Sequence, residues 1–413
     1  MLIKTSRFTM PSHSDTPAAN APIWQQRVAK ANQQRHAASQ WRSRRTLSSA
    51  QAVEVRLGEG NEQQTLLNFC SNDYLGLANQ AGEDLASAAR EWGLGSGASH
   101  LVCGHSSVHD ELERALARYT GYPKALLFST GFMANLGCIN ALAQRGDLVV
   151  QDKLNHASLI DGALLSRADF QRYRHLDYPQ LQRRLQKRDA DMALVVSDSI
   201  FSMDGDLADV AQLANLCEQQ NAMLMIDDAH GLGILGEQGR GVRNHFGLTS
   251  QQLPLYIGTL GKALGGFGAF AAADEATIDY LVQFARPYIY TTALPPAVAA
   301  AMLANLERMH DDRLRQQLQA AIGYFRQQAK ALGLQLMPSD SPIQPLMVGA
   351  EDDALAISKA LEQDNIWVTA IRPPTVPEGS SRLRITLTAA HTQQHLDRLL
   401  QALDRHVPEE QRA

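Results

Sequence analysis

Residues 222–231 read Ala-Met-Leu-Met-Ile-Asp-Asp-Ala-His-Gly, an apolar run that ends in two aspartates and a histidine. Farther along, residues 258–266 read Gly-Thr-Leu-Gly-Lys-Ala-Leu-Gly-Gly, which sets Lys262 among glycines and small side chains. In pyridoxal phosphate enzymes a lysine forms a Schiff base with the cofactor. A carboxylate keeps the pyridine nitrogen protonated, so that the ring withdraws electrons from a carbanion. Asp227, His230 and Lys262, in this order, predict that chemistry.

Two other glycine-rich motifs compete with this interpretation, and each lacks a required part. A phosphate-binding P-loop has Ser or Thr directly after its lysine, whereas Ala263 follows Lys262. Residues 231–236 match G-x-G-x-x-G, but a dinucleotide site also needs a helix at the glycines and an acid about 20 residues on. Here more glycines follow, and residues 251–258 contain no acid. The sequence therefore favours the Schiff-base lysine.

The composition is typical of a large globular enzyme. The chain has 413 residues, 45% of them hydrophobic and 20% charged, which is enough for a large core and two lobes. Its net charge is −5, so no basic field predicts binding to nucleic acid or to an anionic membrane. No apolar run approaches the roughly 18 residues that a membrane-spanning helix needs.

The four cysteines, Cys70, Cys103, Cys138 and Cys217, are far apart and form no C-x-x-C pair. This spacing argues against a zinc site and against a disulfide framework, so we expect no metal and a location in the reducing cytoplasm. The first 20 residues are polar and lack the apolar stretch of a secretory signal. They are expected to form a frayed tail.

From about residue 125, short apolar runs alternate with helical patterns. This alternation predicts an α/β fold whose large domain has a mostly parallel sheet covered by helices on both faces. The predicted strands cover 125–128, 148–151, 193–197, 222–226, 255–258 and 268–272. The predicted helices between them cover 131–142, 156–165 and 207–218.

After Arg286 and Pro287 the pattern becomes that of a smaller α+β domain. We predict two helices within 296–332, a strand over 343–348, a helix from Asp353, strands over 366–370 and 383–387, and a last helix from Thr392. The expected organisation is a tail over 1–20, an N-terminal segment over 21–70, a large domain over 71–286 and a small domain over 287–413.

Polar residues follow several of the predicted strands. Gly131 opens a helix after the first strand, and His156 follows the second. Ser202 follows the third, and Asp227 and His230 follow the fourth. In sheets of this type ligands bind at the carboxyl ends of the strands. These residues therefore predict a site at that edge of the sheet.

Several motifs together resemble the α-oxoamine synthases, pyridoxal phosphate enzymes of the aspartate aminotransferase fold. The motifs are residues 227–236, 258–262, Phe-Ser-Met-Asp-Gly-Asp at 201–206, Asn-Asp-Tyr-Leu-Gly at 72–76, and His109 with Leu112 and Glu113. The resemblance runs from about Trp24 to the C-terminus. It implies an enzyme that joins an amino acid to an acyl thioester with loss of CO2.

The resemblance implies three catalytic residues around pyridoxal 5′-phosphate. Lys262 holds the cofactor and takes the proton from the substrate Cα, which requires a lowered pKa. Asp227 pairs with the ring nitrogen, and His156 stacks on the ring face.

Further cofactor contacts are implied by the same resemblance. Ser202 and His230 reach the phenolic oxygen of the cofactor. The phosphate lies on the backbone N–H groups of Gly131 and Phe132, at a helix N-terminus that favours anions, with the hydroxyl of Thr259. Thr291 or Thr292 reaches the phosphate of a partner subunit, which implies a homodimer with active sites at the subunit interface.

The substrate side of the resemblance depends on residues 370–377, which read Ala-Ile-Arg-Pro-Pro-Thr-Val-Pro. Together with the Asp-Asp-Ala-His-Gly motif, they most resemble the branch of the family that condenses L-alanine with a pimeloyl thioester in biotin synthesis. The thioester is carried by CoA or by acyl carrier protein (ACP). Arg372 is expected to clamp the alanine carboxylate. Asn72 and His156 line the same pocket, and Arg42 and Thr375 lie toward the acyl substrate.

Two positions depart from the family pattern, and two alternatives stay open. Asp198 stands where Glu is frequent, and His100 stands where Arg is frequent. The first alternative is a sister synthase that uses glycine, such as 2-amino-3-ketobutyrate CoA ligase or 5-aminolevulinate synthase, which differs only in its substrate pockets. The second is a non-catalytic partner subunit on the same fold, which would be expected to lack Lys262.

Overall fold

The computed structural model describes residues 21–38, 40–58, 60 and 63–412. The chain divides into two units, Met1–Thr46 and Leu47–Ala413. The predicted tail over 1–20 lies outside the described residues. In the first unit, helix α1 (Ile23–Ala37) has no buried residue. All further elements belong to the second unit.

A seven-stranded sheet forms the centre of the second unit, in the order β3-β9-β8-β7-β6-β4-β5. Strands β4 to β8 pair in parallel, and β9 runs antiparallel to both β3 and β8. The strands are β3 (Lys124–Phe128), β4 (Leu148–Asp152), β5 (Asp169–Tyr173), β6 (Ala193–Asp198), β7 (Met223–Asp227), β8 (Leu255–Thr259) and β9 (Ala269–Ala273). The mostly parallel sheet predicted from the apolar runs is confirmed.

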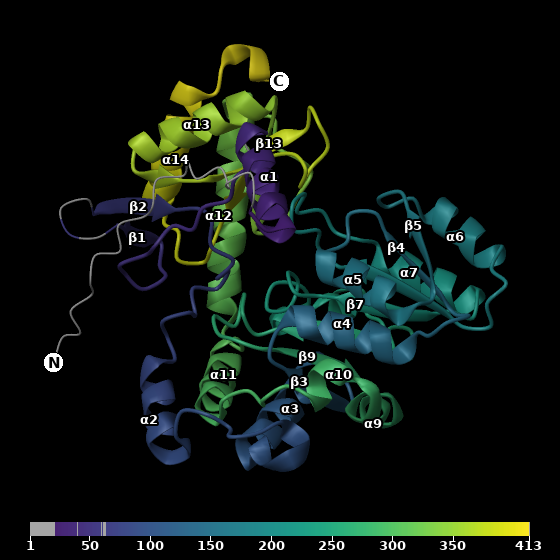
Figure 1. Cartoon of the computed structure of the whole chain (residues 1–413). Helices are drawn as coiled ribbons and strands as arrows, with labels where there is room; N and C mark the ends of the chain where they lie inside the picture. The colour runs from purple at the N-terminus through teal and green to yellow at the C-terminus, as the bar shows by residue number, and fades with distance from the viewer. Residues whose placement is uncertain (1–20, 39, 59, 61–62, 413) are drawn as a thin grey trace. The chain divides into compact units, whose positions relative to one another are not determined.

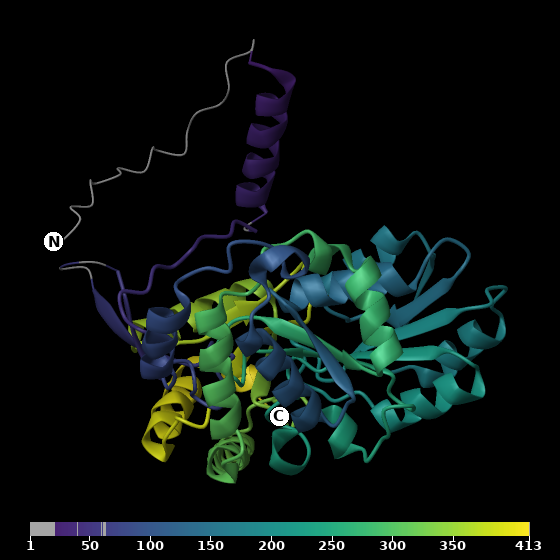
Figure 2. The same cartoon turned by 90° about the horizontal axis from the view of Figure 1, so that it is seen from below.

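Helices cover both faces of this sheet (Figures 1 and 2). One face packs against α4 (Gly131–Leu142), α5 (Ala157–Ser166) and α9 (Glu275–Phe284). The other packs against α3 (Ser107–Thr120), α6 (Tyr178–Gln186) and α7 (Val210–Gln219). The core strands are apolar on both faces because neither face meets water, which is why they were recognisable in the sequence.

Two three-stranded sheets accompany the large one, in the orders β1-β2-β11 and β10-β13-β12. The strands are β1 (Glu54–Leu57), β2 (Gln64–Asn68), β10 (Ile343–Gly349), β11 (Ile366–Trp367), β12 (Thr369–Ile371) and β13 (Ser381–Thr386). The helices of this part are α11 (Pro296–Arg308), α12 (Asp312–Ala331), α13 (Glu351–Gln363) and α14 (Gln393–His406), with α13 beside β13 and α14 in Figure 1. The domain boundary near residue 287 stays a prediction.

Remaining elements are shorter or peripheral. They are α2 (Gly82–Trp92), a π-helical turn (His100–Gly104), α8 (Val242–His245), α10 (Arg286–Ile289) and short 3-10 turns at Glu237–Gly239 and Glu409–Gln411. In the part of the chain that the structure describes, no helix combines the length and the apolarity needed to cross a membrane. The cytoplasmic location stays a prediction.

Three sequence expectations differ from the structure for local reasons. The predicted strand over 366–370 is two strands, because β11 pairs with β2 while β12 pairs with β13. Helix α7 begins at Val210 rather than at 207, since the Asp209 carboxylate accepts a hydrogen bond from Gln212 N and caps it there. Strand β5 was not predicted, because only its last residue is buried and it has no apolar run.

Candidate active site

The carboxyl ends of the parallel strands bring together most of the predicted cofactor residues. Asp227 is the last residue of β7, and its partner in register on β6 is Asp198. Thr259 ends β8, and His156 stands shortly after β4, directly before α5. The sheet edge expected from the strand pattern therefore carries the polar cluster.

Lys262 lies on the connection between β8 and β9, which are antiparallel neighbours. This loop is closed at its base by hydrogen bonds from Leu260 N to Gly268 O (2.9 Å) and from Gly266 N to Leu260 O (2.8 Å). Gly265 has a φ of +69°, and a Cβ there would lie 2.4 Å from the backbone of Leu77 and Ala78. The glycines around Lys262 thus allow a tight loop packed against another backbone segment.

A directed hydrogen-bond chain leads from Lys262 into the protein. The Lys262 amine donates to Nε2 of His230 over 2.8 Å, and Nδ1 of His230 lies 2.5 Å from the Tyr74 hydroxyl. Since Nε2 accepts, Nδ1 carries the proton and donates to Tyr74. The Tyr74 hydroxyl in turn donates to Asn72 Oδ1 over 3.3 Å. His230 is therefore a neutral link that orients the lysine.

Burial controls the protonation of this chain. It lowers the pKa of Lys262 to about 8, an effect that the carboxylates of Asp227 and Asp198 oppose and the guanidinium of Arg384 increases. Burial also holds the pKa of His230 well below its usual value, with the charges of Lys262 and Arg384 acting in the same direction. A fraction of the Lys262 amine is consequently neutral near pH 7, which a base or a nucleophile requires.

Two carboxyl groups, Asp198 and Asp227, stand in register at neighbouring strand ends and act electrostatically on Lys262. Asp227 Oδ1 accepts from Ala229 N (2.9 Å), and Oδ2 accepts from the side chain of Asn135 (2.5 Å). Asp198 Oδ2 accepts from His156 N (2.7 Å). Burial, followed by the charge of Asp227, raises the pKa of Asp198 well above its usual value.

His156 is the N-cap of α5 and not its first helical residue. Its Nδ1 accepts from Ser158 N (3.3 Å) and contacts the Ser158 hydroxyl (2.7 Å), so the ring is held at one edge. The ring remains partly accessible, with Phe132 edge-on at 6.5 Å between ring centroids. Partial burial is the main reason that the pKa of His156 is lowered. A neutral ring with an open face can stack on a planar group.

The N-terminus of α4 provides an open anion site. The Thr130 hydroxyl accepts from Met133 N (3.2 Å) and caps the helix. A Cβ added to Gly131 would meet no atom within 4 Å, and Phe132 is exposed. Backbone N–H groups at such a helix start bind phosphate readily. On β8, the Thr259 hydroxyl donates to Gly268 O (3.2 Å) and accepts from Gly261 N (3.3 Å), so it is already engaged in the loop.

The contacts recorded for the other predicted residues are with different partners. The Arg372 guanidinium pairs with the Glu351 carboxylate at 2.5 Å. Thr292 forms an isolated antiparallel bridge with Ser99, and both Thr291 and Thr292 lie at least partly at the surface. Arg42 belongs to the unit Met1–Thr46, and its assignment to the acyl substrate stays a prediction.

A cavity of about 670 Å³ opens beside the cluster. His156, Ser202 and Thr375 line it, which brings one predicted acyl-side residue next to two predicted cofactor residues. The cavity also contains apolar side chains, among them Phe201 and Met203.

Sequence reasoning assigned no role to Arg384, which is buried on β13 at the cluster. Its Nη2 donates to Asn72 Oδ1 (3.1 Å), and its Nε donates to the carbonyl of Ser202 (2.7 Å). The available signal was weak: Arg384 stands between the apolar residues Leu383 and Ile385, but the same strand also contains Arg382. Asn135, which holds Asp227, was also missed, although it lies one turn into the helix that Gly131 opens.

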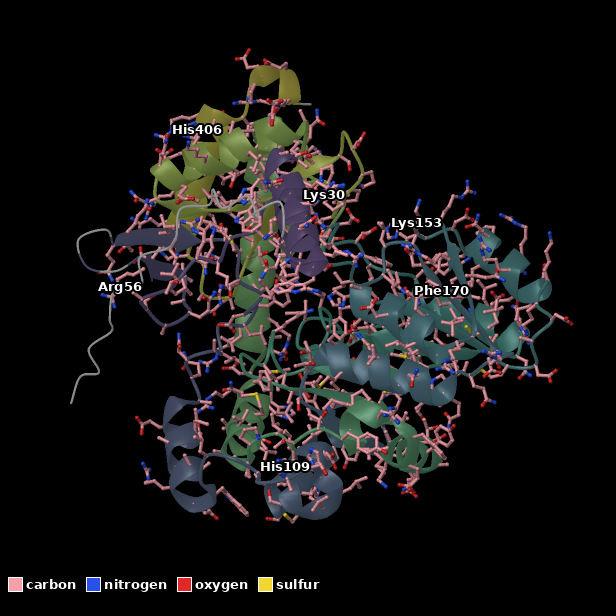
Figure 3. All side chains as sticks on the ribbon, in the orientation of Figure 1. Lys30, Arg56, His109, Lys153, Phe170 and His406 are labelled. Atoms are coloured by element: carbon pink, nitrogen blue, oxygen red, sulfur yellow. The ribbon has the colours of Figure 1, made fainter. Side chains whose placement is uncertain are left out.

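The departure at His100 falls in a separate histidine cluster. His100 Nδ1 lies 2.7 Å from His105 Nδ1, and its ring stacks on Tyr288. His109, labelled in Figure 3, accepts from Ser106 N and contacts the carbonyl of Leu294, so both of its nitrogens have partners.

Comparison with known proteins assigns the family. Residues 64–403 match the model of aminotransferase class I and II. The 8-amino-7-oxononanoate synthase of Cellvibrio japonicus is 55% identical over 397 residues, which are 95% of this chain and 96% of that protein. The chain belongs to the 8-amino-7-oxononanoate synthase family, within aminotransferase class I and II.

Solved structures agree with membership of the 8-amino-7-oxononanoate synthase family. The enzyme of that name from Francisella tularensis is 32% identical with a TM-score of 0.73, covering 84% of this chain and 98% of that one. A structure of serine palmitoyltransferase (SPT) with a PLP internal aldimine is 27% identical with a TM-score of 0.86, covering 94% of this chain and 98% of that one. The predicted fold class and family resemblance are thereby confirmed.

Proposed function

We propose that this chain condenses L-alanine with a pimeloyl thioester, releasing CO2 and the free thiol and giving 8-amino-7-oxononanoate for biotin synthesis. The observation that carries the proposal is the 55% identity to an 8-amino-7-oxononanoate synthase across 95% of the chain. The presence of Lys262 within its hydrogen-bond chain argues against a non-catalytic subunit. Pyridoxal 5′-phosphate is the cofactor, in keeping with the family and with the SPT structure.

The residues at the sheet edge fit this cofactor. An amine, a carboxylate and an accessible imidazole face stand on neighbouring strand ends, and the open helix start at Gly131 offers room and donors for a phosphate. We assign Lys262 as the covalent anchor, Asp227 to the ring nitrogen and His156 to the ring face. Ser202, His230 and Thr259 stay assigned to the polar groups of the cofactor. Bound there, pyridoxal phosphate supplies an electron sink for a carbanion at the amino acid Cα.

The protein's own contribution to the chemistry centres on proton transfer at Lys262. Its pKa of about 8 makes the amine a usable base near neutral pH, and His230 keeps Nζ pointing in one direction. The amine takes the proton from the alanine Cα and returns a proton after CO2 has left. Asp198 positions His156 by accepting a hydrogen bond from its backbone N–H.

Two arginines compete for the alanine carboxylate. Arg372 was expected to bind it, but its guanidinium is paired with Glu351. Arg384 is buried, contacts Asn72 and is close enough to Lys262 for its charge to affect the lysine pKa. Geometry therefore favours Arg384 as the carboxylate ligand, with Asn72 beside it. Arg372 would serve only after leaving Glu351.

A homodimer is part of the proposal. Leu94, Val102 and Tyr290 are 89%, 78% and 71% exposed, and the bridge between Ser99 and Thr292 brings their segments together. Exposed apolar clusters of this kind mark protein interfaces. The cluster lies next to Thr291 and Thr292, in keeping with their assignment to a partner's phosphate site. Sedimentation of the holoenzyme and of Val102→Asp would show whether this surface holds two copies together.

The deciding experiment crosses amino acids with acyl thioesters. The purified protein, loaded with pyridoxal phosphate, is assayed for CO2 and thiol release with alanine or glycine against pimeloyl, acetyl and succinyl thioesters. We expect alanine with the pimeloyl thioester to give the highest kcat/KM. A preference for glycine with acetyl-CoA or succinyl-CoA would refute the substrate assignment. A protein that binds no cofactor covalently would refute the proposal that the chain is a pyridoxal phosphate enzyme.

A further inference from the structure

The cavity beside His156 and Ser202 carries an unusual set of charges. Besides His156, four of its lining side chains are cationic or can become so: Lys153, Arg172, His175 and Arg382. These side chains differ in whether a carboxylate of the protein neutralises them. A cation that lines a cavity and has no acidic partner is available to bind a ligand.

Two of the four are neutralised within the protein. Arg382 forms an ion pair with Asp204, and both side chains are buried. His175 lies between Asp152 (3.1 Å) and Asp206 (2.7 Å). Burial alone would lower the pKa of His175, but its hydrogen bonds to these two carboxylates raise the pKa to about 10. The positive charges of Arg382 and His175 are therefore compensated by carboxylates of the protein.

The other two have no acidic partner in the part of the chain that the structure describes. Lys153 is exposed, and Figure 3 shows it at the surface of the lobe that carries β4 and β5. Arg172 is exposed and donates through Nη2 to the carbonyl of Lys153. This bond joins the Arg172 side chain to the backbone of Lys153, and among the described residues Nε and Nη1 of Arg172 have no hydrogen-bond partner.

Their position in the sheet links them to the reaction site. Arg172 on β5 pairs in register with Gln151 on β4, and Lys153 directly follows β4. Both therefore stand at the carboxyl ends of parallel strands, the edge that also carries His156. One cavity joins the two exposed cations to His156 and Ser202.

We propose that Lys153 and Arg172 bind the phosphate of the phosphopantetheine arm that carries the acyl group. The inference rests on the proposed function, in which a thioester reacts beside the cofactor, and it places the thioester in the cavity that His156 and Thr375 line. The arm between sulfur and phosphate is neutral, and the cavity offers it apolar side chains such as Phe201, Met203 and Val376. The inference places the phosphate at the far end of the arm beside Lys153 and Arg172, where an arginine with free donors and a lysine can bind it.

The phosphate explains the location of these cations better than the terminal carboxylate of a pimeloyl chain. Exposed cations at a rim suit a group that remains tethered to a carrier in solvent. The phosphate is common to CoA and to ACP, so Lys153 and Arg172 would bind a group that both acyl donors contain. Selection between the two carriers would then depend on surfaces beyond Lys153 and Arg172.

The test uses the holoenzyme with alanine and three acyl donors. These are pimeloyl-CoA, pimeloyl-pantetheine without phosphate, and heptanoyl-CoA without the terminal carboxylate. For Lys153→Gln and Arg172→Gln we expect KM to rise about tenfold with both CoA thioesters, the loss of one charge-assisted contact. With pimeloyl-pantetheine the variants should match the wild type. Arg183→Gln, an exposed cation on α6 outside the cavity, should leave all three KM values unchanged.

The outcomes separate this inference from the proposed function. If the wild-type enzyme uses neither pimeloyl-CoA nor pimeloyl-ACP, the proposed function fails before the variants are compared. If the wild type is active and the variants lose affinity equally for pimeloyl-pantetheine, or keep normal KM values for both CoA thioesters, the phosphate site is wrong. A defect confined to pimeloyl donors and absent with heptanoyl-CoA would assign the cations to the acyl carboxylate and would also overturn it. Pimeloyl-ACP as a fourth donor should show the same defect as pimeloyl-CoA.

Discussion

The residues around Lys262 and the loop over 372–380 are both assigned to the proposed reaction. They differ in the hydrogen bonds and ion pairs that hold their side chains. Lys262, His230, Tyr74 and Asn72 form an unbroken hydrogen-bond chain. In the loop, Thr375 is exposed and Arg372 is held by one surface-accessible carboxylate. The cofactor end of the site is therefore built before a ligand arrives, whereas the substrate end has contacts that a ligand can replace. Removal of a preorganised group should therefore reduce activity more than removal of a group whose contacts a ligand can replace.

The largest effect is expected for Lys262→Ala. Removing the amine takes away the covalent anchor and the base together, so kcat should fall by about 10⁴-fold. The holoprotein should lose its visible cofactor absorbance band and its sensitivity to borohydride. Lys359→Ala, an exposed lysine on α13, is the matched control and should behave as the wild type. Near-normal turnover in Lys262→Ala would contradict the central assignment.

The next effect distinguishes the two arginines. Arg384→Ala removes a buried cation that contacts Asn72, and the KM for alanine should rise about 30-fold, as for a lost charged hydrogen bond. Arg372→Ala should change it less than about threefold, because an accessible ion pair contributes little. Steady-state kinetics with alanine at saturating acyl donor measures both. A larger defect in Arg372→Ala would restore that residue as the clamp.

A smaller effect concerns pH. Burial lowers the pKa of Lys262 from 10.5 to about 8, so the neutral amine becomes more abundant as pH rises through 8. Covalent capture of pyridoxal phosphate by the cofactor-free protein should accelerate about tenfold between pH 7 and pH 9, following that fraction. Stopped-flow absorbance would measure the rate. A midpoint near 10.5 would mean that burial does not act on this amine in solution.

The smallest effect is expected at the open helix start. Gly131→Ala places a methyl group where no protein atom lies within 4 Å, so the melting temperature of the cofactor-free protein should not change. Cofactor affinity should fall about fivefold, as for one weakened hydrogen bond. Gly137→Ala on the same helix is the contrast, because its Cβ would lie 3.2 Å from Pro287 and 3.3 Å from Phe128. That variant should lose thermal stability instead, and the reverse pattern would exclude Gly131 from the phosphate site.

Most of the large sheet was predictable because its central strands are covered on both faces and are therefore continuous apolar runs. Strand β5 is an edge strand with charged, exposed positions, and nothing in its local sequence distinguishes it from a loop. The same distinction applies to the site. Asp227 and Lys262 are marked by strand ends and by glycines that immediately surround them.

Contacts that depend on chain topology were not predictable from local pattern. The hydrogen bond between Arg384 and Asn72 joins residues 312 positions apart, and the one between Tyr74 and His230 joins residues 156 apart. Local periodicity carries no information about such pairs. For Arg372 the local motif was informative but incomplete. It assigned the residue to the substrate loop but could not show that its guanidinium pairs with Glu351.

The antiparallel strand β9 has a mechanical consequence for Lys262. A lysine on a strand-to-helix loop could move with its helix, but this one is mounted on a short hairpin connection between two hydrogen-bonded strands of the main sheet. Hydrogen bonds at the base of this connection restrain the backbone that carries Lys262. An amine tethered in this way has a high effective concentration at any point within its reach. Under the proposed function, Lys262 would stay within reach of the reacting carbon whenever it is not bonded to the cofactor, so the same nitrogen would serve each proton transfer and the release of the product.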